Sequence, residues 1–138
     1  MTPFHLAIPV HDIELTMSFY LNTLGCTEGR SDNLWVDFNF LGHQLVCHFD
    51  KNEPRTLHSI PVDNQDVPIL HFGVVQNMPD CEQLAAKLVD LKINFIIQPY
   101  IRFKDLPGEQ AIIFFTEPCG NAIETKAFQN MKTQLFPC

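Results

Sequence analysis

An internal repeat is the feature that most constrains what this chain can fold into. The order strand, helix and three strands occurs twice, and the alignment of the two halves places His5 on His71. The matched segments are Phe4–Val10 with Leu70–Val75, and Gly42–Val46 with Gly120–Glu124. Units of this kind bury one face of a sheet under a helix. The repeat therefore predicts two βαβββ modules whose other sheet faces line a shared cavity.

Apolar alternation and turn residues predict the individual elements. Strands are expected over Phe4–Val10, Trp35–Phe40, Gln44–Phe49, Ile69–Val75, Phe95–Gln98, Ala111–Glu117 and Ala122–Phe128, with a weaker one near Cys26–Arg30. The first helix is expected to begin after Asp12 and to end before Gly25, and the second follows Pro79 with Asp80 as its N-cap. Residues 51–67 are polar and contain two prolines, which indicates a linker.

These elements predict an α+β fold in a single domain over residues 1–138. A chain of 138 residues is typical of one domain, and 46% hydrophobic residues with 12 Phe suffice for a core without disulfides. The expected parts are a first module over about residues 3–50, the linker 51–67, a second module over about 68–128 and a tail over 129–138.

The composition excludes several kinds of partner. A net charge of −7 argues against a nucleic-acid groove, which would need clustered Lys and Arg. No apolar stretch approaches the roughly 18 residues of a membrane span, and the N-terminus lacks a basic segment followed by an apolar one. The 5 cysteines form no CxxC pair, so they are interpreted as reduced core thiols, with one catalytic cysteine as an alternative. We therefore expect a cytoplasmic protein that binds a small molecule.

Strand alternation places three metal-binding side chains on the sheet faces away from the helices. His5 and His71 each alternate with an apolar run that must lie under a helix, and Glu124 lies opposite Ile123. Such polar groups are costly to desolvate together unless a cation compensates them. Two imidazoles and one carboxylate form the facial set that holds a divalent metal and leaves positions open for substrate or O₂. The predicted ligands are therefore His5, His71 and Glu124.

The segments that carry a family resemblance are Phe4–Asp12, Ser18–Tyr20 with Leu24 and Gly25, Leu70–Val74, and Pro118–Glu124. In these segments the chain resembles the vicinal oxygen chelate superfamily, which includes glyoxalase I, extradiol dioxygenases, epimerases, and fosfomycin- and bleomycin-resistance proteins. The resemblance covers essentially the whole chain as paired βαβββ modules. It implies that His5, His71 and Glu124 fall on metal-ligand positions. It also implies a homodimer, which in some members exchanges modules between chains.

The resemblance separates subclasses at a fourth metal position. The internal repeat places Val46 at the position that supplies the fourth ligand in glyoxalase I, and valine cannot bind metal. Three-ligand members, such as dioxygenases and fosfomycin-type thiol transferases, are therefore favoured. His48 lies about 6.6 Å further along the same face. It is the expected acid or base beside the metal, or a fourth ligand if the register differs by two residues.

Three further residues are expected to bind substrate: Gln44, Asn39 and Arg102. The predicted function is a dioxygenase-like reaction on a small vicinal-oxygen substrate, such as a catechol or diketone, with iron(II) or manganese(II) and with zinc(II) or nickel(II) as alternatives. The alternatives are a glyoxalase or other lyase, an epimerase or a thiol transferase, a metal-free antibiotic-binding resistance protein, and a member that retains only the fold.

Overall fold

The computed structural model describes residues 2–52 and 58–136, and its contacts divide the chain into two compact units. The N-terminal unit comprises Met1–Thr56 and Glu117–Asn121, and the C-terminal unit comprises Leu57–Thr116 and Ala122–Cys138. Each unit contains a mixed sheet with a helix packed against it, so the predicted α+β class is confirmed. In the residues described, no helix is both long enough and apolar enough to span a lipid bilayer.

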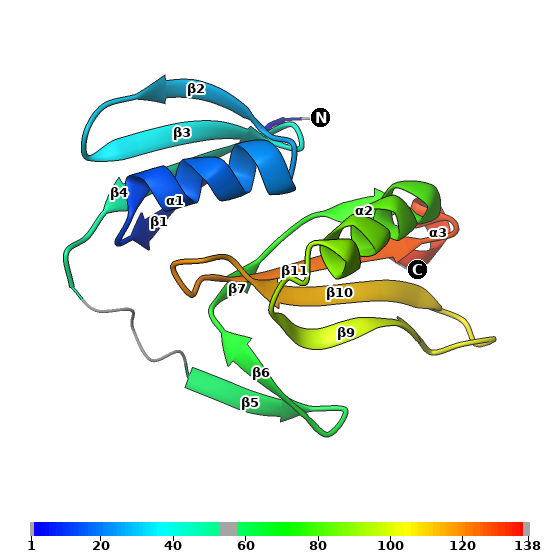
Figure 1. Ribbon diagram of the computed structural model, residues 1–138. Coiled ribbons are helices and arrows are strands. Elements are labelled where there is room, and N and C mark those ends of the chain that lie inside the picture. The colour runs from blue at the N-terminus through cyan, green and yellow to red at the C-terminus, as the bar shows by residue number, and fades with distance from the viewer. Residues whose placement is uncertain (1, 53–57, 137–138) are drawn as a thin grey trace. The chain divides into compact units, whose positions relative to one another are not determined.

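The sheet of the N-terminal unit has the order β1-β4-β3-β2, in which β1 runs parallel to β4 (Figure 1). Its strands are β1 (His5–Val10), β2 (Thr27–Ser31), β3 (Trp35–Phe40) and β4 (His43–Phe49). Each strand agrees with its expected range to within one residue at either end. Alternation of apolar and polar residues was therefore sufficient to predict the strands of this sheet.

One continuous helical segment covers the sheet of the N-terminal unit. Asp12 caps it, because its carboxylate accepts a hydrogen bond from the backbone N–H of Leu15 at 2.9 Å. The α-helix α1 (Ile13–Ser18) continues directly as the π-helical segment η1 (Phe19–Thr23). The segment ends before Gly25, whose φ of +71° favours glycine. Both predicted ends are confirmed.

Aromatic packing fixes which face of this sheet lies under the helix. The Tyr20 ring stacks on Phe38 with 4.9 Å between ring centroids and meets Phe40 edge-on at 6.3 Å. All three rings are buried. Phe38 pairs with Leu45, whereas His5 pairs with the adjacent Gln44. Because successive side chains alternate between faces, His5 lies on the face away from the helix.

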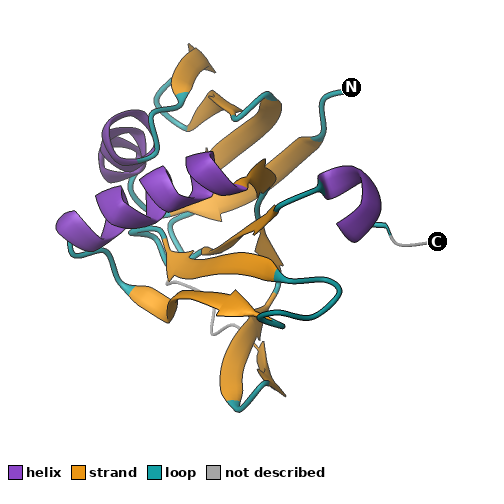
Figure 2. Ribbon diagram, turned by 90° about the vertical axis from the view of Figure 1, so that its right-hand side faces the viewer, coloured by secondary structure: helices purple, strands orange, loops and turns teal. Residues whose placement is uncertain are grey.

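The sheet of the C-terminal unit has the order β7-β11-β10-β9, and β8 also pairs with β11. Its strands are β7 (His71–Phe72), β8 (Val75–Asn77), β9 (Phe95–Arg102), β10 (Gln110–Thr116) and β11 (Ala122–Phe128). The expected strand over Ile69–Val75 is divided into shorter pieces, and β9 extends to Arg102, which the sequence placed in a loop. A short helix, α3 (Met131–Gln134), lies within the expected tail (Figure 2).

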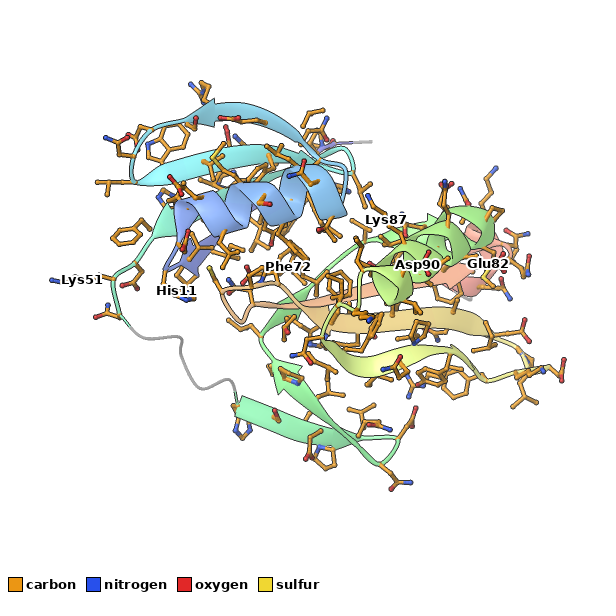
Figure 3. All side chains as sticks on the ribbon, in the orientation of Figure 1. His11, Lys51, Phe72, Glu82, Lys87 and Asp90 are labelled. Atoms are coloured by element: carbon orange, nitrogen blue, oxygen red, sulfur yellow. The ribbon has the colours of Figure 1, made fainter. Side chains whose placement is uncertain are left out.

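Helix α2 (Met78–Asp90) packs against β10 and β11. Its exposed side includes Glu82, Lys87 and Asp90, which Figure 3 labels. Asn77 is its N-cap, because the Asn77 side chain accepts a hydrogen bond from the backbone N–H of Asp80 at 2.9 Å. The prediction that Asp80 caps this helix was therefore wrong. Pro79 is tolerated inside the first turn, where its missing N–H costs no hydrogen bond.

Residues 58–69 form a hairpin where the sequence predicted a linker. Strands β5 (His58–Val62) and β6 (Gln65–Ile69) pair antiparallel, and Asp63 and Asn64 form the turn with φ of 48° and 62°. Two successive positive φ values are typical of a type I′ hairpin turn. The linker interpretation was thus wrong for residues 58–67. Proline was taken as a sign of a loop, but the two strands of an isolated hairpin are edge strands, which tolerate proline. Residues 53–57 of the expected linker lie outside the described residues.

The hairpin packs on the C-terminal sheet through Val67. This side chain is buried in a cluster with Phe114 and Ala122, to which Val62, Ile96 and Ile97 add partly buried contacts. Phe114 pairs with Glu124, and Ala122 pairs with His71. Directly paired residues share a face. The hairpin therefore covers part of the face that carries His71 and Glu124.

The turn between β10 and β11 belongs to the N-terminal unit. Its buried Glu117 carboxylate accepts hydrogen bonds from the backbone N–H groups of Cys119 at 2.9 Å and Asn121 at 2.7 Å. The Asn121 amide donates to the carbonyl oxygen of Pro9 in β1 at 2.9 Å. Burial raises the pKa of Glu117, and these hydrogen bonds and His11 partly oppose that rise.

The described cysteines are core residues. Cys26, Cys47, Cys81 and Cys119 are buried free thiols, and Cys138 lies outside the described residues. Burial raises the pKa of Cys26 and of Cys81 to about 11, and it also raises that of Cys47. These three thiols are therefore protonated at neutral pH, which agrees with a packing role and not with an activated nucleophile.

Candidate metal centre

Strand register arranges the polar face of the N-terminal sheet in rows. His5 pairs with Gln44, and Gln44 pairs with Asn39 in β3, so these three residues form the first row. The second row includes Val46 and Asp37, and His48 lies in the third. At about 3.3 Å per residue, the third row is about 13 Å along the strands from the row of His5. Val46 pairs with Ala7 of β1, and the internal repeat aligns Val46 with Glu124.

A chain of hydrogen bonds fixes the His5 ring. The Gln44 amide donates from Nε2 to Oδ2 of Asp37 at 3.1 Å, which leaves its Oε1 as an acceptor. His5 Nδ1 lies 2.8 Å from that oxygen and must therefore donate to it. In the neutral imidazole, Nε2 then carries the lone pair. A metal-binding histidine is typically oriented in this way, with its other ring nitrogen donating to a nearby oxygen.

His71 is oriented by the backbone of the hairpin. Its Nδ1 lies 2.7 Å from the carbonyl oxygen of Pro68 in β6. A carbonyl oxygen can only accept, so Nδ1 donates and the neutral ring again has its lone pair on Nε2. The ring also packs edge-on against Phe114, with 4.9 Å between centroids. A backbone acceptor and an aromatic neighbour thus hold the second imidazole.

The Nε2 atom of His71 lies 3.2 Å from Oε2 of Glu124. With Nδ1 as the donor, the contact between Nε2 and the carboxylate oxygen is favourable when Nε2 carries a proton or when a cation lies between the two atoms. Two ligands that bind one divalent ion at about 2.1 Å and at right angles are about 3.0 Å apart. The observed spacing is close to that value. His71 and Glu124 therefore fit two adjacent ligand positions of one divalent metal ion.

Further polar groups lie beside this pair. Lys126 Nζ is 3.5 Å from Oε1 of Glu124. Tyr100 shares the face, because Ile112 pairs with both Tyr100 and Lys126. Burial raises the pKa of Tyr100, and the carboxylates of Asp63 and Glu124 raise it further against the effect of Arg102. The phenol is therefore a neutral hydrogen-bond donor at physiological pH.

Each expected substrate-binding residue already has a partner within its own unit. Gln44 bridges His5 and Asp37, as described above. The Asn39 amide oxygen accepts a hydrogen bond from the backbone N–H of Gly42 at 2.7 Å, within the β3–β4 turn. Arg102 Nε lies 2.7 Å from Oδ2 of Asp63, and its guanidinium lies over the Phe103 ring. Their role in substrate binding stays a prediction.

Within the described part of either unit, no three His, Cys, Asp or Glu side chains converge closely enough to hold a metal ion. The C-terminal unit brings together His71 and Glu124, and His5 belongs to the N-terminal unit. Their assignment to one ion stays a prediction. The donor chemistry of all three residues fits a divalent metal, since each imidazole uses Nδ1 in its hydrogen bond and leaves Nε2 for a ligand bond.

Sequence reasoning missed three contributors to this site. The Pro68 carbonyl is a backbone atom, so it leaves no side-chain signal, and its hairpin was interpreted as a linker. Asp63 was missed for the same reason. Lys126 alternates in phase with Glu124, and that signal could have identified it as a neighbour of the predicted ligand.

Comparisons with known proteins agree with this architecture. Residues 2–125 match the family model described as the glyoxalase/bleomycin resistance protein/dioxygenase superfamily. A search of the curated proteins found no match. A solved glyoxalase/bleomycin resistance protein/dioxygenase from Alicyclobacillus acidocaldarius is 28% identical, with a TM-score of 0.77, over 95% of this chain and 94% of that one.

Two other similar structures have named activities. Lactoylglutathione lyase from Agrobacterium tumefaciens is 13% identical with a TM-score of 0.64, over 93% of this chain and 94% of that one. The fosfomycin resistance protein FosX from Listeria monocytogenes is 13% identical with a TM-score of 0.66, over 97% and 96%. At this identity the similarity shows the fold alone. On the match over residues 2–125, the chain belongs to the glyoxalase/bleomycin resistance protein/dioxygenase superfamily.

Proposed function

We propose that the chain is a metal-dependent enzyme that acts on a small molecule with two vicinal oxygens, by a dioxygenase-like reaction. The proposed ligands are His5, His71 and Glu124, and the proposed ion is iron(II) or manganese(II), with zinc(II) or nickel(II) as alternatives. Such an ion acts as a Lewis acid toward neighbouring oxygens and, when redox-active, activates O₂. A homodimer in the cytoplasm is part of the proposal.

The observation that carries the proposal is the orientation of the two imidazoles. His5 Nδ1 donates to Gln44, and His71 Nδ1 donates to Pro68, so both rings present Nε2 as a base. In the C-terminal unit that base faces the Glu124 carboxylate at 3.2 Å. A divalent cation held between Nε2 and the carboxylate would satisfy both groups at once, as a proton on Nε2 also would, so the metal-binding measurements below decide between the two.

His48 is the proposed acid or base. It is exposed on the polar face of the N-terminal sheet, two rows from His5, and Val46 lies between those rows. A positioned acid or base contributes about 10²-fold or more to a rate. We expect His48→Gln to lower kcat by about that factor and to leave the metal content unchanged. Loss of metal in this variant would instead make His48 a ligand.

Oxygen consumption tests the reaction class. The chain is loaded with iron(II) without O₂ and then supplied with O₂ and a panel of substituted catechols in an oxygen electrode. We expect uptake above that of free iron(II) for at least one catechol, retained in His58→Ala and lost in Glu124→Ala. His58 is an exposed histidine of β5 and controls for histidine removal in general.

The remaining outcomes separate the alternatives. Metal-loaded protein that consumes no O₂ with any catechol would favour a lyase, an epimerase or a thiol transferase, which use the ion as a Lewis acid only. Failure to bind metal after reconstitution would favour a metal-free binding protein or a member that retains only the fold.

A further inference from the structure

A lysine lies beside the candidate metal ligands of the C-terminal unit. Lys126 follows Glu124 by two residues in β11, so the two side chains share a face. Its Nζ lies 3.5 Å from Oε1 of Glu124, whereas His71 approaches Oε2. The Lys126 side chain is 34% exposed and that of Glu124 is 15% exposed. The Lys126 ammonium is therefore more accessible to a dissolved molecule than the Glu124 carboxylate beside it.

Charge balance on this face changes when a divalent ion is bound. Without the ion, the Glu124 carboxylate compensates Lys126. A divalent ion carries two positive charges, and the Glu124 carboxylate neutralises only one of them. With the ion bound, the charge of Lys126 is therefore no longer compensated. Arg102 does not add to that excess, because Asp63 neutralises it at 2.7 Å. A bound ion and Lys126 together make the face attractive to an anion, although the whole chain has a net charge of −7.

Tyr100 provides a neutral donor on the same face. Ile112 of β10 pairs with Lys126 on one side and with Tyr100 on the other, so all three side chains point the same way. Tyr100 is exposed, and the charges of Arg102 and of Asp63 in the hairpin turn act on its hydroxyl. An ammonium from β11 and a phenol from β9, on the same face and on either side of β10, form a pair of donors suited to an oxyanion.

We propose that Lys126 and Tyr100 form an anion-binding subsite beside the candidate metal ligands, so that the substrate has an acidic group next to its metal-binding oxygens. This inference rests on the proposed metal-dependent function and specifies its substrate class: an aromatic or aliphatic vicinal-oxygen compound that also carries a carboxylate or similar oxyanion. Lys126 contacts the acidic group of the substrate and has no part in binding the metal.

Paired ligands that differ by one carboxylate test the inference. The protein is loaded with zinc(II), which undergoes no redox chemistry, and titrated by calorimetry with catechol, 3,4-dihydroxybenzoate and 2,3-dihydroxybenzoate. We expect at least one of the benzoates to bind about tenfold more tightly than catechol, the effect of one charge-assisted hydrogen bond. Lys126→Gln should lose that preference and keep the affinity for catechol and for zinc(II). Lys126→Arg, which retains the charge, should keep the preference.

The outcomes distinguish this inference from the function on which it rests. If both benzoates bind no better than catechol, or if Lys126→Gln keeps the wild-type preference, the anion subsite is wrong and the metal site stands. Absence of binding by all three ligands to zinc-loaded protein also overturns the inference. If the wild-type chain binds no zinc(II), the proposed function fails as well. Thermal unfolding of each variant verifies that it is folded.

Discussion

Hydrogen bonds on the far side of each imidazole decide which ring nitrogen can bind metal. His5 depends on Gln44, whose own orientation depends on the buried Asp37. His71 depends on the Pro68 carbonyl. The two halves of the repeat thus hold their imidazoles with different groups: a side-chain amide in the first and a backbone carbonyl in the second.

Removal of the Gln44 acceptor should therefore weaken metal binding. In Gln44→Leu the His5 Nδ1 loses its hydrogen-bond acceptor, so neither the tautomer nor the orientation of the ring is fixed any longer. Loss of such a partner weakens metal binding by about 10- to 100-fold. Competition for zinc(II) against a coloured chelator measures the change. Gln83→Leu, at an exposed position of α2, is the control. Equal zinc affinity in Gln44→Leu and wild type would contradict the role of His5.

At this scale the sequence predicted the positions of the side chains better than their partners. Alternation placed His5 on the face away from α1 and put Glu124 on the same face as Lys126. It assigned Arg102 to a free loop, whereas the structure pairs this residue with Asp63. A partner that a distant turn supplies leaves no periodic signal, so it could not be predicted from alternation.

Among the elements, the β5–β6 hairpin combines a packing role with a role in the site. It buries Val67 against Phe114 and contributes the Pro68 carbonyl that orients His71. The strands with strict alternation, such as β3 and β11, were predicted with their observed bounds. The hairpin was not, because its prolines and polar turn are equally typical of a linker.

Truncation of Val67 should measure how firmly the hairpin is held. Val67→Ala removes two methyl groups from a buried cluster and should lower the free energy of unfolding by about 2 kcal/mol. Ile60→Ala, at an exposed position of the partner strand β5, should change it by less than about 0.5 kcal/mol. Urea unfolding followed by circular dichroism gives both values. Equal losses would mean that the hairpin is not packed on the sheet.

Gly73 has a packing constraint of its own between β7 and β8. A Cβ atom at this position would overlap the backbone carbonyl of Glu124. Gly73→Ala should therefore separate the chain from β11 and lower the free energy of unfolding by about 3 kcal/mol. Gly42→Ala is the comparison, because it has a positive φ but no atom within 4 Å of the added Cβ. It should lose only about 1–2 kcal/mol. Urea unfolding that gives Gly73→Ala the smaller loss would contradict the close approach.

For the whole molecule, the buried Glu117 makes stability depend on pH. Its pKa is raised in the folded chain above the ordinary value of 4.5. Between the two pKa values the unfolded chain has released the proton that the folded chain still holds, so rising pH favours unfolding. The contribution of Glu117 to stability is therefore largest below pH 4.5 and is lost as the pH rises through the folded pKa.

Unfolding free energies measured as a function of pH test this dependence. The stability of wild type relative to Glu117→Gln should fall as the pH rises from about 4 to about 7. Glu82→Gln, on the exposed side of α2, should show no such trend relative to wild type. A stability difference between wild type and Glu117→Gln that grows with pH would mean that the hydrogen bonds, and not burial, dominate the pKa of Glu117.

Metal content tests the central claim most directly. Wild-type protein is reconstituted with iron(II) under anaerobic conditions, passed through a desalting column and analysed by atomic emission, together with His71→Ala, Glu124→Ala and the control His58→Ala. We expect stoichiometric metal in wild type and His58→Ala, and a large loss in the other two variants, because His71 and Glu124 face one another at 3.2 Å. Metal content in His71→Ala equal to that of wild type, or wild type that holds no metal, would contradict the account.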